Sequence, residues 1–103
     1  MAIAEKTAKD SAAIEKQIEK LIEEMTISEK IGQLSLVNSI FGKISKSLKE
    51  TITNGNIGGI LNEVDVNIVN ELQRIAVEES RLGIPLLIGR DVIHGFKTIF
   101  PIP

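Results

Sequence analysis

The sequence has no cysteine, which excludes a disulfide framework and a thiolate metal site and leaves the redox compartment open. It also has no tryptophan or tyrosine and only three phenylalanines, so there are few aromatic platforms for stacking bases or sugars. The formal net charge is −2, which gives no basic footprint for nucleic acid. Nucleic acid is therefore not an expected partner.

Long apolar runs are missing as well. No run approaches the length of a membrane span, so we expect no membrane partner. The first 20 residues are charged and contain no apolar core, so no signal peptide is visible and the localisation stays open. His94 is the only histidine and has no second histidine or carboxylate pair nearby, so we expect no metal site and no cofactor.

What is present is ordinary for one globular unit: 103 residues, of which 43% are hydrophobic and 25% charged. Residues 1–12 are small, polar and charged, and we expect a disordered tail there. Residues 13–103 are expected to form one domain, which begins with a helix because its apolar residues fall on one helical face: Ile14, Ile18, Leu21, Ile22 and Met25.

Local signals place the next elements. Thr26 and Glu29 have the spacing of a capping box, which predicts a short helix that passes into the segment IGQLSLV at residues 31–37. A second apolar stripe predicts a helix that ends at Gly55, with Phe41, Ile44, Leu48 and Ile52 on its buried side. The expected order of elements is helix, short helix, helix, strand, helix, strand.

The pair Gly58-Gly59 lies in a short apolar run, residues 57–61, which predicts a buried strand. No GxGxxG or GxxxxGK pattern follows, so close backbone packing explains these glycines better than a phosphate cradle. Asn62 and Glu63 then sit at the carboxyl end of the strand, where they can border a pocket. Asp65 is the expected N-cap of the following helix, and Gly83 its stop.

Residues 81–103 hold the best candidate site. Pro85 and the apolar run 86–88 predict a parallel strand covered on both faces. Arg90, Asp91 and His94 follow at its carboxyl end, the edge where α/β sheets and barrels bind ligands.

Asp91 has two interpretations on spacing alone. Its carboxylate can accept hydrogen bonds from two neighbouring sugar hydroxyls, or it can cap the following turn or pair with Arg90. His94 is either part of a pocket wall or a hydrogen-bonded loop residue, and Arg90 is a possible pocket-lining residue. Gln33 is a weaker candidate sugar ligand, and a polar helix end explains it better.

Four segments resemble, in order, the N-terminal part of glycoside hydrolase family 3, the β-glucosidases and related exo-glycosidases: MTISEKIGQLS at 25–35, NIGGILN at 56–62, NELQRIAVEESRLG at 70–83 and GIPLLIGRDVIHGFKTIFPIP at 83–103. The resemblance covers roughly residues 14–103. It implies an α/β fold, the N-terminal portion of a (β/α)₈ barrel that needs about 250 residues when complete. It also implies that Asp91 binds hydroxyls of the non-reducing-end sugar. Family members are commonly periplasmic or secreted.

The resemblance also shows what this sequence lacks. Retaining glycosidases use two carboxyl groups roughly 5 Å apart. In the family the nucleophile is an aspartate that follows a serine, and the sequence contains no Ser-Asp pair. The Lys-His sugar-binding pair and the acid/base residue of the family have no counterpart either, so we assign no catalytic residue.

We therefore expect a fragment of a retaining exo-β-glycosidase that removes terminal β-D-glucosyl residues, inactive alone. Its partners are a β-linked glucoside or oligosaccharide in the complete enzyme, and either copies of itself or the missing barrel segments. The alternative is a stand-alone small α/β module, derived from such a barrel, that serves in binding or assembly.

Overall fold

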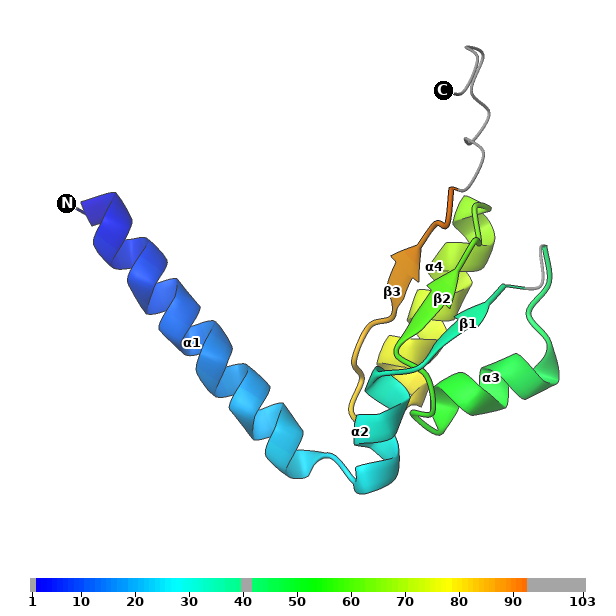
Figure 1. Ribbon diagram of the computed structural model, residues 1–103, viewed down its shortest axis with the longest axis horizontal. Coiled ribbons are helices and arrows are strands. Elements are labelled where there is room, and N and C mark those ends of the chain that lie inside the picture. The colour runs from blue at the N-terminus through cyan, green and yellow to red at the C-terminus, as the bar shows by residue number, and fades with distance from the viewer. Residues whose placement is uncertain (1, 40–41, 93–103) are drawn as a thin grey trace, which may run out of the picture.

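The computed structural model describes residues 2–39 and 42–92, with side chains from residue 10 onward. Within these residues the chain forms helices on a small sheet (Figure 1). The elements in chain order are α1 (Ala2–Glu24), α2 (Ile27–Gln33), β1 (Leu36–Asn38), α3 (Lys46–Thr53), β2 (Gly59–Leu61), α4 (Val66–Arg74), the π-helical turn η1 (Ile75–Glu79) and β3 (Leu87–Gly89). None of the described helices is both long enough and apolar enough to cross a membrane.

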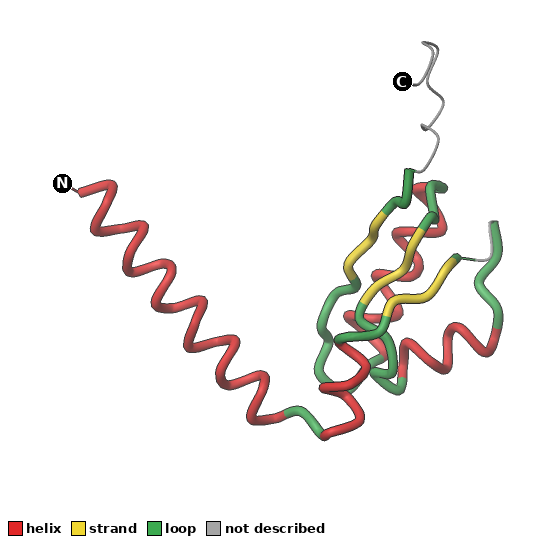
Figure 2. The backbone as a smooth tube through the Cα atoms, viewed as in Figure 1, coloured by secondary structure: helices red, strands yellow, loops and turns green. Residues whose placement is uncertain are grey.

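The three strands form one parallel sheet in the order β1-β2-β3, as the yellow segments of Figure 2 show. In its middle row, Val37 pairs with Ile60 and Ile60 with Ile88. Because all strands run the same way, their carboxyl ends meet at one edge. An α/β fold with a parallel sheet is thus confirmed, and closure into a barrel stays a prediction.

β1 is a correction to the expected order, which had no strand between the second and third helices. Only Leu34 and Ser35 separate the end of α2 from Leu36, and neither is a glycine or proline that would mark the change from helix to strand. The strand is defined by its pairing with β2, more than 20 residues away in the chain, where Gly58 N donates to Ser35 O (2.9 Å) and Ser39 N to Leu61 O (2.8 Å). Pairing over such a distance leaves no local signal.

One face of the sheet carries the hydrophobic core. Ile60 is fully buried and packs with residues of α3, α4 and η1, namely Ile52, Leu72, Ile75 and Ala76. Gln73 of α4 fixes the start of β3 here: its Nε2 donates to Leu86 O (2.7 Å) and its Oε1 accepts from Leu86 N (2.8 Å). The helix therefore holds β3, and the loop after it, in place.

The other face of the sheet is open in this chain. Leu36 and Leu87 are 56% and 74% exposed, on either side of Gly59 in the same row. The expectation that residues 86–88 are covered on both faces is therefore wrong: Leu86 is buried, but Leu87 is not. The apolar run at residues 86–88 is typical of a strand buried on both faces, but the described elements cover only one face of it. We call Leu36, Gly59 and Leu87 the open apolar row.

The paired glycines are confirmed as sites of close backbone packing. A Cβ on Gly58 would lie 2.4 Å from the carbonyl oxygen of Gln33. One on Gly59 would lie 2.4 Å from Leu36 Cδ2 and 2.8 Å from the carbonyl oxygen of Leu87. Both glycines therefore let β2 approach its neighbours more closely than any other residue could.

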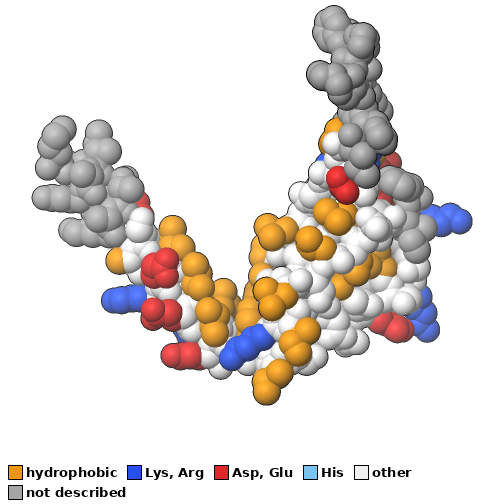
Figure 3. Space-filling view, viewed as in Figure 1, with side chains coloured by type: hydrophobic (Ala, Val, Ile, Leu, Met, Phe, Trp, Pro, Cys, Tyr) orange, Lys and Arg blue, Asp and Glu red, His pale blue; other side chains and the backbone are white. Residues whose placement is uncertain are grey.

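α1 extends away from the sheet and differs from expectation at both its start and its apolar face. It begins at Ala2, where we expected a disordered tail over residues 1–12; alanine, lysine and glutamate, which favour helices, dominate this segment. The stripe expected to be buried is partly exposed, with Ile14, Ile18 and Ile22 each about half accessible. Figure 3 shows apolar side chains of α1 facing the V-shaped gap beside the body.

Most helix ends follow the sequence signals. The capping box of Thr26 and Glu29 is present, Asp65 caps α4 through Asn67 N and Ile68 N, and Gly55 and Gly83 take left-handed conformations. The third helix is shorter than expected, because Ser45 caps α3 at Leu48 N (3.0 Å) and Ile44 precedes it. Phe41 lies outside the described residues.

Candidate functional site

The carboxyl edge of the sheet gathers polar residues from all three strands. Asn38 is the last residue of β1, Asn62 follows β2, and Arg90 and Asp91 follow β3. The parallel register brings these positions together, as expected for Arg90 and Asp91. His94 lies outside the described residues, so its place in a pocket wall stays a prediction.

Asn62 connects the three strand ends. Its side-chain Oδ1 accepts a hydrogen bond from Asp91 N (2.9 Å), and its Nδ2 donates to Asn38 Oδ1 (3.2 Å). Its backbone N donates to Gly89 O (2.8 Å), and its carbonyl oxygen accepts from Arg90 Nη1 (3.4 Å). The backbone of Asp91 is thus attached to β2 through one side chain, while the Asp91 residue itself is exposed.

Glu63 lies buried beneath this edge. It is only 5% exposed, and Ser39 Oγ donates to its Oε2 while the amides of Val64 (3.0 Å) and Asp65 (3.1 Å) donate to its Oε1. The hydrogen bond from Ser39, joined by backbone amides that include that of Gly42, keeps the pKa of Glu63 below its ordinary value despite burial. Glu63 is thus an ionised acceptor that joins the β1 and β2 loops.

This arrangement limits the chemistry of the edge. Both oxygens of Glu63 are occupied by donors, so it cannot serve as a proton donor to a substrate. Asp91 is an exposed carboxylate beside the exposed cation Arg90. Such an edge suits the binding of a neutral, hydroxyl-rich ligand through hydrogen bonds to a carboxylate.

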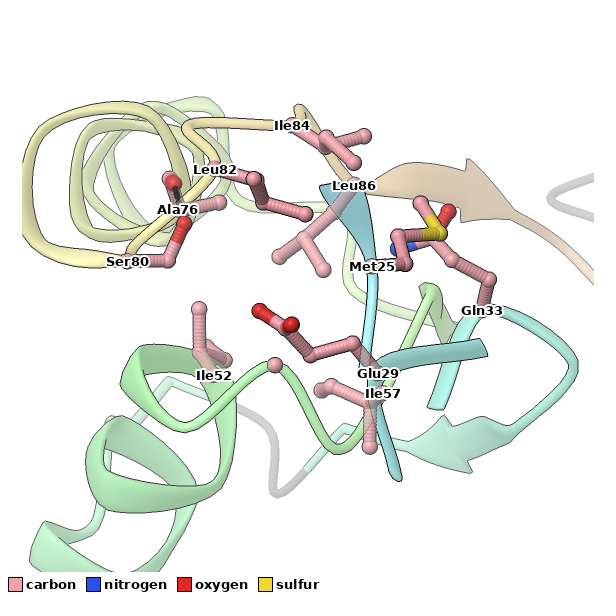
Figure 4. A pocket seen from close by; sticks show the side chains of 11 residues that line it. Met25, Glu29, Gln33, Ile52, Ile57, Ala76, Ser80, Leu82, Ile84 and Leu86 are labelled. Carbon is pink, nitrogen blue, oxygen red and sulfur yellow. Dashed lines mark hydrogen bonds between the residues drawn. The ribbon is translucent and has the colours of Figure 1, made fainter. Parts of the chain in front are cut away.

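A small cavity lies at the opposite, amino edge of the sheet and has a different character. It encloses about 20 Å³, on the order of one water molecule. Figure 4 shows the carboxylate of Glu29 pointing into it between Ile52 and Ser80. Gln33 also lines this cavity, far from the edge that carries Asp91, which favours its interpretation as a structural residue.

Glu29 is held there by an ion pair that joins distant parts of the chain. Arg81 Nε donates to Glu29 Oε2 (3.2 Å), and Arg81 Nη2 donates to Glu29 Oε1 and to the carbonyl oxygen of Glu24 (2.7 Å). The hydrogen bonds from Arg81, followed by the one from Thr26 N, lower the pKa of Glu29 to about 2. The capping box of α2 therefore also anchors the segment before β3, and this edge is structural.

Sequence reasoning missed the role of Asn62 and the pairing of Ser39 with Glu63. A signal for both was present, because similar tripeptides mark the two strand ends: LVN, which is β1, is followed by Ser39, and ILN, which runs one residue past β2, is followed by Glu63. Polar residues at equivalent ends of adjacent parallel strands meet in space. That signal becomes readable only once residues 36–38 are assigned to a strand.

Two comparisons with known proteins point to the same family. The family description "Glycosyl hydrolase family 3 N terminal domain" matches residues 26–103. The chain is also similar to the protein named "Periplasmic beta-glucosidase" of Salmonella typhimurium (strain LT2), with 39% identity over 82 residues. That alignment includes 80% of this chain but only 11% of the relative.

Proposed function

Because the chain belongs to glycosyl hydrolase family 3, we propose that it is part of a retaining, exo-acting β-glycosidase and contributes Asp91 to the binding of the terminal sugar. The substrate class is a β-linked glucoside or oligosaccharide with a free non-reducing glucosyl end. An exported location is the corresponding proposal for the complete protein, since the relative named above is periplasmic.

One observation carries the proposal: Asp91 stands exposed at the carboxyl edge of a parallel sheet, with its backbone amide held by Asn62. Ligands of α/β folds bind at this edge. An ionised carboxylate can accept hydrogen bonds from two vicinal hydroxyls at once, and it discriminates against sugars that lack them.

The chemistry of bond cleavage must come from other residues of the complete enzyme. Retaining hydrolysis requires a nucleophile and an acid/base carboxyl group roughly 5 Å apart. Among the described residues, the other carboxylate near Asp91 in this edge is Glu63, whose oxygens are taken by Ser39 and backbone amides. We therefore assign this chain a substrate-binding role without a catalytic residue.

We expect the 103-residue chain alone not to hydrolyse aryl β-glucosides above background. The complete reading frame that contains it should do so, and Asp91→Ala should impair that activity. Both are measured with a chromogenic glucoside on homogeneous preparations. Turnover by the isolated chain that disappears in Asp91→Ala would contradict the proposal that this chain binds substrate and that other residues catalyse. A reading frame that stops at Pro103 would favour the stand-alone module.

We also expect the isolated chain to self-associate. The open apolar row presents Leu36 and Leu87 to solvent next to the unpaired edges of β1 and β3 in the described sheet, and such surfaces recruit other chains. Leu87→Lys should shift the chain toward monomer, whereas Val66→Lys, an exposed valine at the start of α4, should not.

Sedimentation velocity over a range of concentrations measures this difference. The expectation fails if the unmodified chain stays monomeric throughout that range. It also fails if both lysine variants reduce association equally, because the effect would then come from added charge.

A further inference from the structure

We infer that Asn62 is a positioning residue for sugar binding, because it fixes the backbone from which the Asp91 carboxylate projects. The inference rests on the proposed function of Asp91 for its effect on activity. The fixing of the backbone itself is an independent physical statement with its own measurement.

The contacts of Asn62 converge on the segment that follows β3. Its backbone N donates to Gly89 O (2.8 Å), its carbonyl oxygen accepts from the side-chain Nη1 of Arg90 (3.4 Å), and its side-chain Oδ1 accepts from Asp91 N (2.9 Å). Three consecutive residues are therefore attached to one residue of the neighbouring strand. The ladder between β2 and β3 ends at Leu61 and Gly89, and the Asn62 side chain continues it to Asp91.

The orientation of the Asn62 amide group follows from its partners. The backbone N–H of Asp91 requires an acceptor, so it must face Oδ1, which leaves the NH₂ group directed toward Asn38 Oδ1 (3.2 Å). Both ends of the side chain are thus satisfied by groups from the two flanking strands. A side chain held at both ends has little rotational freedom left to release Asp91.

The backbone of Asn62 is also specified. It has φ 70°, the left-handed region that asparagine and glycine tolerate better than other residues. Immediately after it, buried Glu63 binds the amides of Val64 and Asp65 and the hydroxyl of Ser39, which locks the start of the loop. Glycine would fit this conformation but lacks the amide, and aspartate would supply the acceptor but not the donor.

These requirements define the informative variants. Asn62→Gly keeps the left-handed backbone and removes both side-chain hydrogen bonds. Asn62→Asp retains an acceptor for Asp91 N and loses the donor to Asn38. Asn54→Gly is the matched control, since Asn54 is exposed at the C-terminal end of α3 and lies far from the carboxyl edge.

In the complete enzyme, we expect Asn62→Gly to lower kcat/KM for an aryl β-glucoside by about 10- to 100-fold, because misplacement by about 1 Å costs on the order of 10²-fold. In the Asp91→Ala background the same change should have little further effect, since there is no carboxylate left to position. Asn62→Asp should fall between Asn62→Gly and the unmodified enzyme. Asn54→Gly should match the unmodified enzyme.

Hydrogen exchange gives the second readout. Mass spectrometry of peptides covering residues 86–92 should show faster exchange at the Asp91 amide in Asn62→Gly and unchanged exchange in Asn54→Gly. Unchanged exchange in Asn62→Gly would overturn the inference, and so would equal kinetic losses with and without Asp91. If Asp91→Ala proves harmless, the proposed function fails, and the exchange result still decides whether Asn62 fixes this backbone.

Discussion

Replacing Asp91 by alanine in the complete enzyme is expected to lower kcat/KM for a β-glucoside by about 10²- to 10⁴-fold. A hydrogen bond to a charged group is worth roughly 1.5–3 kcal/mol, and Asp91 is proposed to accept two from the terminal sugar. With each 1.36 kcal/mol equal to about tenfold, two such bonds account for the expected range. The bonds should tighten as the ring distorts toward the transition state, so kcat should fall as well as kcat/KM.

Two comparisons separate this role from a structural one. Asp91→Asn keeps the shape of the side chain and loses its charge, so its effect should be smaller than that of Asp91→Ala. Substrates that lack the contacted hydroxyl should show a reduced loss, because the unmodified enzyme is already without that interaction. If both variants lose the same activity on every substrate, in step with a lower melting temperature, Asp91 is a cap.

The second large effect concerns stability. Gly58→Ala is expected to destabilise the fold by about 3 kcal/mol or more, at the upper end of overpacking. The new methyl group would lie 2.4 Å from the carbonyl oxygen of Gln33 and 2.8 Å from its Cα. These are backbone atoms at the junction of α2 and β1, so relief requires β2 to move away from both. Urea unfolding at low protein concentration, followed by circular dichroism, measures the change.

Gly42→Ala is the control for this prediction. Unlike Gly58, Gly42 has a positive φ, +74°, but a Cβ there would meet nothing within 4 Å. Its cost is limited to the left-handed backbone, roughly 1–2 kcal/mol. A Gly58→Ala chain that unfolds at the urea concentration of the unmodified chain would show that the α2–β2 approach is not required.

The sequence predicted those features that depend on a few neighbouring residues. The cap at Thr26, the N-cap at Asp65 and the left-handed stops at Gly55 and Gly83 are local hydrogen-bond or dihedral requirements, and all are present. The strand at 59–61 was also predictable, because its apolar run is bounded by glycine and asparagine.

Features that depend on pairing between distant segments were not predictable in the same way. Leu36 becomes part of a strand only through β2, and Asn62 contacts Asp91 only because β2 and β3 are adjacent. The apolar pattern around Leu87 indicated burial on two faces, whereas these elements cover one. The pattern at Leu87 thus fits a larger fold than the described residues form.

The open apolar row has a consequence for the synthesis of the complete barrel proposed above. Chains emerge N-terminus first at about 5–20 residues per second, and a barrel of about 250 residues leaves roughly 150 still to be made after this segment. Leu36 and Leu87 would then stay uncovered for on the order of 10 to 30 s. During that interval the open apolar row would be accessible to other nascent chains and to holding chaperones.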